Sequence, residues 1–499
     1  MPPRKNAGFA KPQNAGATLK RIFSYMYGFK PQLFLIVFCI IISVSANVTG
    51  NYMLRPLIDN YIEPFIGQDN PDLSGFVSTI IMMSVIYLFG AVSTYIYQRI
   101  MVTVSTTTLF RIRTDLFNKM ESLPIRYFDK HTHGELMSLY TNDADAVREM
   151  LSNSVAQFIS SAITVLSVFV IMVVYSWQLT ILVIVILFIM IQVIGVIGKN
   201  SGKGFKAQQE SLGKVNGYIE ELIEGQKVVK VFCHEEKANE EFQKLNENLC
   251  QASTRANTYA NILMPIMNNL SYFHYAGTAI AGGIMAVKGI GGMTVGTVVS
   301  YLQFTRSFSQ PITQLSQQLN SVLTALAGAE RIFKVIDEEP EEDNGYVTLV
   351  NAEISADGTI TETEKHTGFW AWKHPHKAEG TVTYTKVEGK VEFDDVVFGY
   401  EPNKTVLNGI SLYAKAGQKI AFVGSTGAGK TTITNLINRF YDVPDGKIRY
   451  DGININKIKK DDLRRSLSMV LQDTHLFTGT VMDNIRYGKL DATDEEVYK

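Results

Sequence analysis

The sequence predicts a multi-domain chain in which an all-α transmembrane domain of six helices precedes an α/β domain with a phosphate-binding loop. Two observations lead to this fold class. Several long runs without charged residues occupy the first two thirds of the 499 residues, and each can cross a hydrocarbon core, which takes about 20 residues. Residues 424–431 then read Gly-Ser-Thr-Gly-Ala-Gly-Lys-Thr, a complete G-x-x-x-x-G-K-[ST] phosphate loop.

Charge-free runs place the six predicted spans. The run 151–198 would be about 72 Å long as one helix, more than twice the ~30 Å of a hydrocarbon core. We therefore expect it to fold back at residues 175–178, Tyr-Ser-Trp-Gln, whose aromatic side chains suit the membrane interface. The predicted spans are 31–54, 73–98, 151–174, 179–198, 256–287 and 293–315.

The connections on one side of the predicted membrane are long and rich in Lys and Arg, which places them in the cytoplasm. They keep a helical composition, so the spanning helices should continue beyond the membrane, with short elements at the tips near 125–131 and 212–221. These tips are the expected contacts with the nucleotide domain. The sequence thus predicts a multi-pass protein of the cell (cytoplasmic) membrane, surrounded by lipid, with both termini in the cytoplasm and an N-terminal cytoplasmic segment at 1–30.

Composition excludes other classes. A formal net charge of -1 argues against a nucleic-acid surface, and three cysteines without metal-ligand spacing indicate free thiols.

The phosphate loop has the expected local context, with a predicted buried strand at 419–423 and a predicted helix at 431–437. Its glycines let backbone N–H groups surround phosphate oxygens. Lys430 is expected at the β- and γ-phosphates, and the Thr431 hydroxyl at Mg²⁺, against the alternative of a glycine-rich turn with a surface lysine. ATP and Mg²⁺ are the predicted cofactors, and the predicted ATP-binding residues here are Gly424, Ser425, Thr426, Gly427, Ala428, Gly429, Lys430, Thr431 and Thr432.

Several further motifs carry a resemblance to ATP-binding-cassette (ABC) exporters of the six-helix, domain-fused type. The first cytoplasmic loop is similar in Phe128-Asp129-Lys130-His131, Gly134–Ser138 and Thr141–Asp145, and the second in Gly217–Glu221 and Gly225–Phe232. The nucleotide domain is similar in Phe398-Gly399-Tyr400, in the glutamine loop Val470–Phe477 and in Thr478–Ile485.

The resemblance implies roles for two more residues. Tyr400 is expected to stack on adenine, where the alternative is an ordinary strand-end tyrosine, and Gln472 is expected to approach Mg²⁺ and the attacking water, where the alternative is a solvated amide. It also implies an ABC-type ATPase that couples ATP hydrolysis to export. The chain would then be a half-transporter that dimerises with a second half-transporter, identical or different.

The resemblance also predicts features that this sequence does not contain, namely a Leu-Ser-Gly-Gly-Gln signature, a Walker B strand with the catalytic Glu, and a switch His. We expect a C-terminally truncated chain rather than a disabled subunit, and a chain that is inactive alone. Two other functions stay open: a non-hydrolysing regulatory subunit and a structural partner in a heterodimeric transporter. Val335-Ile336-Asp337-Glu338 resembles a Walker B ending but precedes the phosphate loop, and it is interpreted as a linker.

The predicted domains are 1–30, 31–338, a linker with a small β appendage at 339–389, and a partial nucleotide-binding domain at 390–499. Asp357-Gly358 predicts a hairpin in the appendage. A metal at His374 and His376 is disfavoured because no third ligand lies near them in sequence.

Polar residues inside the predicted spans are candidates for a substrate path. Arg306 is the best of them, and Asn47, Asn51, Asn268, Asn269 and His274 are weaker. A stripe on the last span is interpreted mainly as a water-exposed extension of the helix: Gln310, Gln314, Gln317, Gln318 and Asn320. Lipids, peptides and amphipathic drugs all remain possible substrates.

Overall fold

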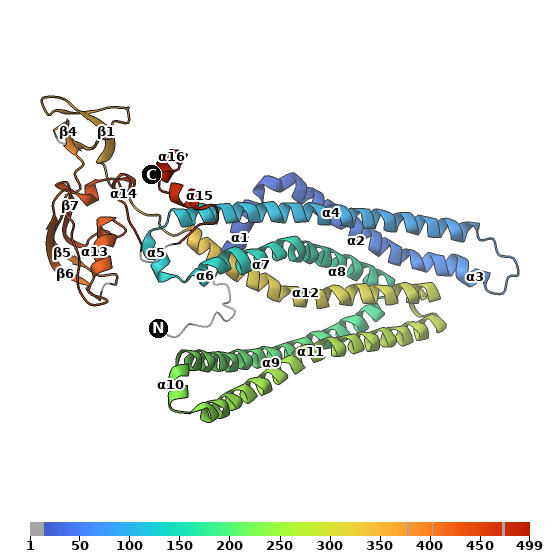
Figure 1. Cartoon of the computed structure of the whole chain (residues 1–499). Coiled ribbons are helices and arrows are strands. Elements are labelled where there is room, and N and C mark those ends of the chain that lie inside the picture. Colours follow the sequence, from blue (N-terminus) through green and yellow to red (C-terminus); the bar gives the residue numbers. More distant parts are fainter. Residues whose placement is uncertain (1–13, 377–378, 402, 472–474) are drawn as a thin grey trace. The chain divides into compact units, whose positions relative to one another are not determined.

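The computed structural model describes residues 14–376, 379–401, 403–471 and 475–499. The chain forms two units, which are treated separately below (Figure 1). One is helical and comprises the residues up to Glu121 together with His133–Glu338. The other contains the strands and comprises Ser122–Thr132 together with Glu339–Lys499.

Long antiparallel helices make up the helical unit (Figure 1). Helix α2 packs against α4, α9 against α11, and α12 against both α8 and α2. The helices are α1 (Ala15–Tyr25), α2 (Lys30–Leu57), α3 (Glu63–Phe65), α4 (Ser74–Glu121), α6 (His133–Ser138), α7 (Ala144–Glu149), α8 (Val155–Tyr175), α9 (Trp177–Glu224), α10 (Gln226–Val231), α11 (Glu235–Val287) and α12 (Val295–Ile336).

The chain folds back at the position that the sequence indicates. Helix α8 ends at Tyr175 and α9 begins at Trp177. Between them the Ser176 hydroxyl accepts a hydrogen bond from the backbone N–H of Leu179 at 3.3 Å, which caps the new helix. The predicted span at 179–198 is therefore the first part of a helix that continues to Glu224.

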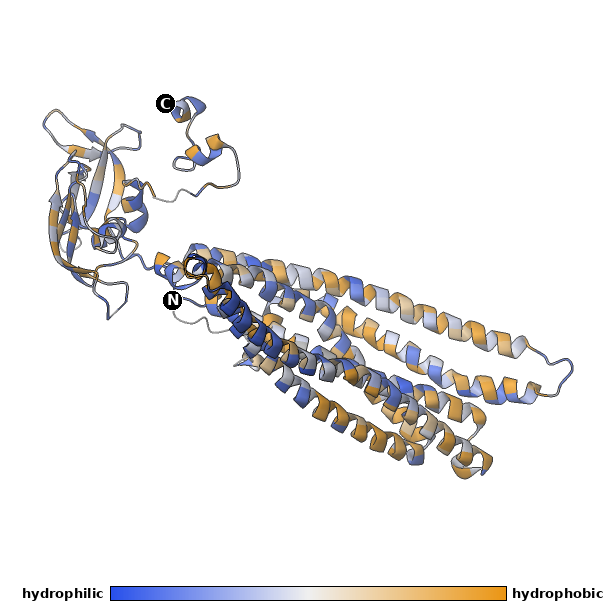
Figure 2. Cartoon of the chain, turned by 60° about the horizontal axis from the view of Figure 1, so that its bottom comes forward, coloured by the Kyte–Doolittle hydropathy of each residue, from blue (hydrophilic) through white to orange (hydrophobic). Residues whose placement is uncertain are grey.

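Four helical stretches among the described residues are long and apolar enough to cross a membrane: Tyr27–Phe65, Ser74–Glu121, His133–Tyr175 and Trp177–Glu224. They contain the first, third and fourth predicted spans, and all of the second except residue 73. The spans at 256–287 and 293–315 lie in α11 and α12, which do not belong to these four, so those two spans stay predictions. Figure 2 shows hydrophobic residues along much of the long helices, with hydrophilic residues gathered toward one end. Several long apolar helices indicate a multi-pass membrane protein.

The structure differs from the sequence-based expectation at the second loop tip. Residues 212–221 lie inside α9, and the short helix at the tip is α10, which starts at Gln226. Helix α9 ends at Glu224 because Gly225 turns the chain there, and a Cβ on Gly225 would come within 3.1 Å of the Glu221 carbonyl oxygen. The first tip matches its prediction and forms the helix α5 (Ile125–Lys130).

The second unit contains two four-stranded antiparallel sheets with the orders β2-β1-β3-β4 and β6-β5-β7-β8. Its strands are β1 (Thr348–Ile354), β2 (Ile360–Glu362), β3 (Trp370–His376), β4 (Thr381–Lys386), β5 (Val391–Phe398), β6 (Leu407–Ala414), β7 (Asp445–Tyr450) and β8 (Ile453–Asn454). Besides α5, its helices are α13 (Lys430–Ile437), α14 (Lys460–Arg465), α15 (Val481–Arg486) and α16 (Asp494–Tyr498).

The first sheet contains the hairpin that Asp357-Gly358 indicates. Gly358 has a φ of +83°, a conformation that glycine adopts without steric cost. The Asp357 carboxylate accepts a hydrogen bond from the backbone N–H of Thr359 at 3.1 Å, and Ile354 pairs with Ile360 across the turn. Turn chemistry is local, which is why the sequence predicts it.

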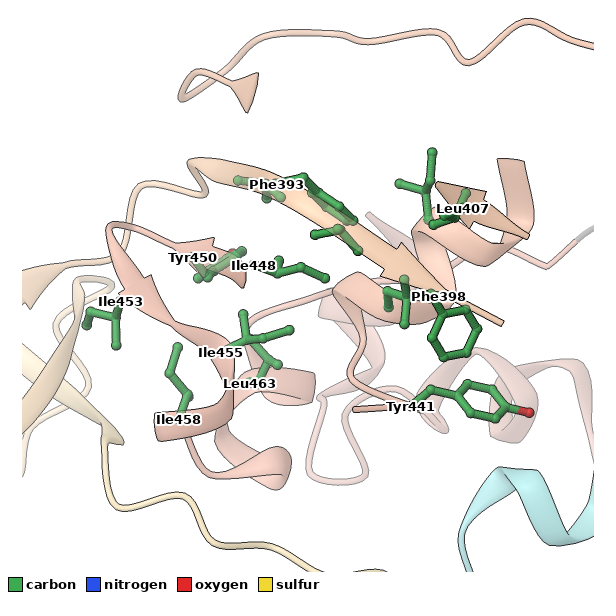
Figure 3. Packing of buried hydrophobic residues seen from close by; sticks show 14 of the residues in the cluster. Phe393, Phe398, Leu407, Tyr441, Ile448, Tyr450, Ile453, Ile455, Ile458 and Leu463 are labelled. Atoms are coloured by element: carbon green, nitrogen blue, oxygen red, sulfur yellow. The ribbon is translucent and has the colours of Figure 1, made fainter. Parts of the chain in front are cut away.

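The second sheet packs on α13 and α14 around one apolar core (Figure 3). Phe393 and Ile448 come from the sheet and Leu436 from α13, and all three are buried. Trp372 of the first sheet reaches the same core and is 0% exposed. Burial of each such side chain contributes about 1.5–3 kcal/mol, so the first sheet is packed against the cassette core rather than suspended on a free linker.

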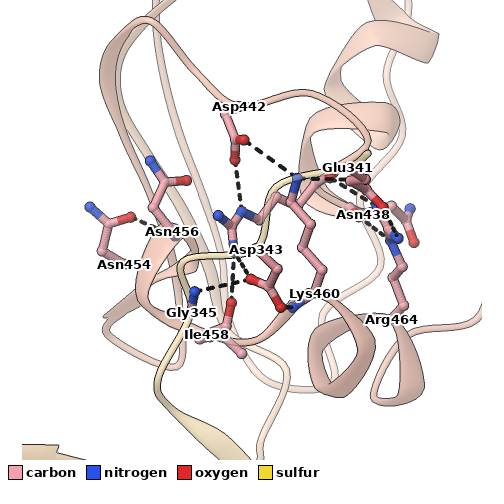
Figure 4. A network of polar contacts seen from close by, with 11 residues as sticks. Glu341, Asp343, Gly345, Asn438, Asp442, Asn454, Asn456, Ile458, Lys460 and Arg464 are labelled. Carbon is pink, nitrogen blue, oxygen red and sulfur yellow. Dashed lines mark hydrogen bonds and ion pairs between the residues drawn. The ribbon is translucent and has the colours of Figure 1, made fainter. Parts of the chain in front are cut away.

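An ion-pair network fastens the segment after α12 to this core (Figure 4). The Arg464 guanidinium donates two hydrogen bonds to the Glu341 carboxylate, at 2.9 and 2.7 Å. The buried Lys460 amine lies 3.3 Å from Glu341 and 3.5 Å from Asp442. Burial favours a higher pKa for Glu341, but the bonds to Arg464 and Lys460 outweigh it and lower the pKa.

Candidate nucleotide site

The phosphate loop precedes α13 as predicted, but the segment before it is not a strand. Residues 419–423 are irregular, and Val423 is 94% exposed. A strand needs hydrogen-bonded neighbours on the sheet, and none of the described strands pairs with this segment. The prediction of a buried strand at 419–423 is therefore wrong for the described chain, although the sequence there is a continuous apolar run after Lys419.

The loop itself brings backbone amides and one cation to a helix start. Helix α13 begins at Lys430, and the preceding Gly429 has a φ of +91°. A Cβ on Gly429 would lie 2.6 Å from a Leu407 methyl group, so any larger residue would also require the Leu407 side chain to move. The N-terminus of a helix favours an anion, because its N–H groups are unpaired and its dipole is positive there.

Lys430 is held within the loop. Its amine donates to the carbonyl oxygens of Gly424 and Ser425, both at 2.8 Å. The charge therefore sits over the curved backbone, where the phosphates of a nucleotide are expected. Residues 421–428 are exposed, so the loop is open to solvent.

Thr431 fits the predicted role of a Mg²⁺ ligand. It lies on the first turn of α13, it is exposed, and its hydroxyl has no hydrogen-bond partner within the described ranges. A hydroxyl oxygen beside the phosphates is the hard ligand that Mg²⁺ prefers. The neighbouring Thr432 is buried, and its hydroxyl faces Tyr400.

Tyr400 lies beside the phosphate-loop helix. Its hydroxyl donates to the Thr432 hydroxyl at 3.2 Å and accepts from the Asn435 amide at 3.3 Å, both on α13. Its ring packs edge-on against Phe398 and Tyr441, with centroids 5.1 Å apart in each pair. The structure thus brings the predicted base-stacking tyrosine next to the predicted phosphate site.

Tyr441 extends this aromatic cluster to the first loop tip. Its hydroxyl donates a hydrogen bond to the carboxylate of Asp129 on α5, and Figure 3 shows that hydroxyl pointing out of the core. Burial, reinforced by the Asp129 carboxylate, raises the pKa of Tyr441, so the phenol stays protonated and can donate. The base-side aromatic cluster and the loop tip are therefore directly bonded within one unit.

Three other predicted sites have different outcomes. Gln472 lies outside the described residues, so its position relative to Thr431 stays a prediction. His374 and His376 have ring centroids 4.3 Å apart, and within the described ranges no group of three potential ligands surrounds a metal position. The Val335–Glu338 segment ends α12 as a linker would, and Asp337 pairs with Arg21 of α1 at 2.5 Å.

Only some of the candidate polar residues of the helical unit lie together in one place. Asn47, Asn51, Gln310 and Gln314 line one cavity between helices. Arg306 does not belong to its lining, and its guanidinium lies 4.9 Å from the Tyr275 ring centre on α11. His274 is buried elsewhere, 3.5 Å from the Ser309 hydroxyl.

The remaining polar candidates lie at other positions. The Asn269 amide donates a hydrogen bond to the Pro265 carbonyl of its own helix, and the Gln318 side-chain carbonyl accepts one from the Ser154 hydroxyl. The side chains of Gln317 and Asn320 lie outside the described part.

A bundle of long apolar helices joined to a phosphate-loop domain defines a membrane protein with a nucleotide-binding domain. Comparison with known families gives the same division. Residues 33–312 match the family described as ABC transporter transmembrane region, and residues 407–499 match the family described as ABC transporter. The chain belongs to the ABC transporter family, with a transmembrane region fused to an ABC ATPase domain, and the fold class predicted from the sequence is confirmed.

Several named relatives are similar in sequence over most of this chain. The ABC transporter ATP-binding protein YfiC of Bacillus subtilis is 37% identical over 488 residues, which are 98% of this chain and 74% of the relative. The fatty acid ABC transporter ATP-binding/permease protein of Mycobacterium bovis is 32% identical over 426 residues, 85% of this chain and 62% of the relative. The ATP-dependent lipid A-core flippase of Syntrophus aciditrophicus is 26% identical over 478 residues, 96% and 72% of the two chains.

Sequence reasoning missed Tyr441, Gln157 and Ser161. The Tyr441–Asp129 bond joins residues 312 positions apart, so no local pattern predicts it. Gln157 and Ser161 did carry a signal, because polar side chains four residues apart in a charge-free run share one helix face.

Proposed function

We propose that this chain is one half of a dimeric exporter that uses ATP binding and hydrolysis to move a substrate out across the cytoplasmic membrane. In this proposal both termini lie in the cytoplasm, and a second half-transporter, identical or different, completes the assembly. Lys430, Thr431 and the loop amides bind the phosphates with Mg²⁺, and Tyr400 stacks on adenine. Gln472 assists the attacking water.

One observation supports the coupling step above all others. Tyr400 packs on Tyr441, and the Tyr441 hydroxyl bonds to Asp129 at the tip of the first cytoplasmic loop. A base stacked on Tyr400 is therefore linked through Tyr441 and Asp129 to α5, the short helix at the tip of that loop. A ligand shifts a conformational equilibrium only through its different affinity for the two states, and this chain of contacts gives ATP a route to such a difference.

Phosphate binding by Lys430 is tested by Lys430→Ala. Loss of a positioned charge at the phosphates is expected to weaken binding of trinitrophenyl-ATP and to lower ATP turnover about 100-fold. The measurement uses the purified full chain in nanodiscs, alone and with a co-expressed partner. Lys447→Ala is the matched control, because Lys447 is an exposed lysine of the same domain on β7.

Unchanged nucleotide binding in Lys430→Ala would contradict the assignment of this loop. Normal nucleotide binding without turnover, with or without a partner, would instead favour the non-hydrolysing regulatory subunit. No nucleotide binding at all by the wild-type chain would favour the structural partner.

A further inference from the structure

A polar cavity of about 240 Å³ lies among three helices of the helical unit. Helices α2, α8 and α12 all contribute to it, and its polar lining consists largely of carboxamides and hydroxyls. The residues on which the following argument depends are Asn47, Asn51, Gln157, Ser307, Gln310 and Gln314.

We expect this cavity to lie within the hydrocarbon core. At 1.5 Å per residue, Asn51 is ~21 Å from Phe65, where the helical stretch Tyr27–Phe65 ends, and Gln157 is ~27 Å from the end of α8 at Tyr175. Both distances fall within the ~30 Å of a bilayer core. Polar residues at that depth are costly to bury, and they mark paths for substrates.

Two hydrogen bonds hold part of the lining in place. The Asn51 amide donates to the Ser307 hydroxyl at 3.1 Å, and the Gln157 amide donates to the Gln314 carbonyl at 2.8 Å. The Asn51 side-chain carbonyl and the Gln314 NH₂ group take part in no hydrogen bond among the described residues. The Asn51 carbonyl is an acceptor and the Gln314 NH₂ group is a donor. The cavity therefore offers a ligand one free acceptor and one free donor.

Asn47 and Gln310 add two adaptable amides. Both line the cavity and both are exposed. Neither makes a hydrogen bond to another described residue. A ligand hydroxyl or amide, which both donates and accepts, would match this mixture of donors and acceptors better than a group that only accepts.

The described lining contains no charged residue. The guanidinium of Arg306 is turned onto Tyr275 and leaves the cavity without a cation. A carboxylate or phosphate placed here would lose water without an opposing charge, which is far more costly than burying a hydrogen-bonded neutral group. The cavity therefore discriminates by charge.

Val44, Val48 and Pro311 supply apolar surface beside the amides. The volume lies below the ~300–1,000 Å³ of complete small-molecule sites, so the cavity suits one head group and not a whole lipid. We propose that it binds the uncharged, hydroxyl- or amide-bearing head group of an amphipathic substrate, such as a glycosylated lipid, and rejects anionic head groups. This inference rests on the proposed export function and narrows its substrate class.

The test measures equilibrium binding of short-chain lipids to the full chain in nanodiscs. Radiolabelled dioctanoyl glucosyl-glycerol is the neutral probe, and dioctanoyl phosphatidylglycerol is the anionic probe with the same tails. Methyl glucoside serves as a competitor that has a sugar but no tail. We expect the neutral lipid to bind at least about tenfold tighter than the anionic one, with little competition from methyl glucoside.

Asn47→Leu and Gln310→Leu test the lining without removing any hydrogen bond inside the protein. Each is expected to weaken neutral-lipid binding about fivefold, and the double variant about 20-fold. Gln303→Leu is the matched control, because Gln303 is an exposed amide on the same helix outside the cavity lining, and it should leave binding unchanged.

Tighter or equal binding of the anionic lipid would overturn the proposal, as would unchanged binding in the double variant. Trinitrophenyl-ATP binding is measured on the same samples. If nucleotide binding and ATP-driven transport persist while the neutral preference is lost, only this inference fails. If Lys430→Ala retains nucleotide binding, the proposed function fails instead.

Discussion

The two loop tips of the helical hairpins have the same length but very different surroundings. Helix α5 is bonded to the nucleotide domain of its own chain through Asp129 and Tyr441. Helix α10 belongs to the helical unit and carries exposed apolar side chains there: Val228 is 60% exposed, Val231 is 76% exposed, and the following Phe232 is 65% exposed. Helix α5 has a hydrogen-bond partner within its own chain, whereas α10 presents an exposed apolar surface.

This difference indicates which tip needs a second molecule. Isolated apolar residues on a surface are ordinary, but a contiguous patch marks a protein or membrane contact. Cysteine at 233, with a φ of +53°, ends the apolar run sharply and turns the chain into α11. We therefore expect α10 to be covered by the nucleotide domain of the partner half-transporter, while α5 serves its own.

Of the changes that test this comparison, the largest effect is expected at the exposed tip α10. Phe232→Asp places a charge where an apolar contact is expected, and it should weaken half-transporter association about 30-fold, equivalent to ~2 kcal/mol. Mass photometry of the full chain with its partner measures this. The control Ile354→Asp alters another exposed apolar residue, on β1, and should not change association. Unchanged association in Phe232→Asp would remove the functional distinction between the tips.

A smaller effect is predicted for the covered tip. Tyr441→Phe keeps the ring against Tyr400 but removes the hydrogen bond to the Asp129 carboxylate. A hydrogen bond to a charged group contributes about 1.5–3 kcal/mol, so ATP-driven transport should fall about tenfold while trinitrophenyl-ATP affinity changes little. Tyr413→Phe, on the exposed face of β6, is the control. Equal losses of transport and nucleotide affinity would show that Tyr441 acts on the base site alone.

The smallest predicted effect concerns the attachment of the α5 loop. The Glu341 N–H donates to the carbonyl of Ser122 at 2.7 Å, just before α5, and its carboxylate binds Arg464 and Lys460. Glu341→Gln removes the charge and should destabilise the second unit by about 1 kcal/mol. Urea unfolding of the full chain, followed by fluorescence of the buried Trp372, measures this loss.

The same carboxylate gives a pH dependence of defined sign. The folded-state pKa of Glu341 is lowered, so its stabilising contribution is complete above the unfolded pKa of about 4.3 and is lost as pH falls through the lower folded value. Glu341→Gln should lack this part of the acid destabilisation. An identical fall of the urea midpoint between pH 6 and pH 3 in both proteins would contradict the role of the network.

Local chemistry decided which features the sequence could predict. The turn at Ser176, the hairpin at Gly358 and the start of α13 depend on residues a few positions apart, and the sequence predicts all three. The sequence did not predict contacts between residues far apart in the chain, such as the Tyr441–Asp129 and Gln157–Gln314 hydrogen bonds. Those contacts depend on how helices pack, which hydrophobic periodicity does not specify.

The two errors of position have physical causes as well. The apolar run at 419–423 has the composition of a strand, but strand formation requires neighbours that composition cannot supply. The second tip was placed too early because Gly213 and Gly217 stay inside α9, and the helix ends only before Gly225. Both cases show that a segment's own preference is overridden by what lies beside it or after it.

The carboxylate of Asp451 accepts hydrogen bonds from the indole of Trp372 at 3.1 Å and from the backbone N–H groups of Glu388 and Lys390, at 3.2 and 2.9 Å. At the other boundary, Val347 exchanges backbone hydrogen bonds with Lys457 and Lys459. Entry and exit of the first sheet are thus both pinned to the short stretch 451–459. The segment that forms the first sheet closes a loop whose ends are held close together, so the entropic cost of closing that loop is small. Insertions or deletions in the outer strands of this sheet should therefore leave Trp372 and the core beneath it in place.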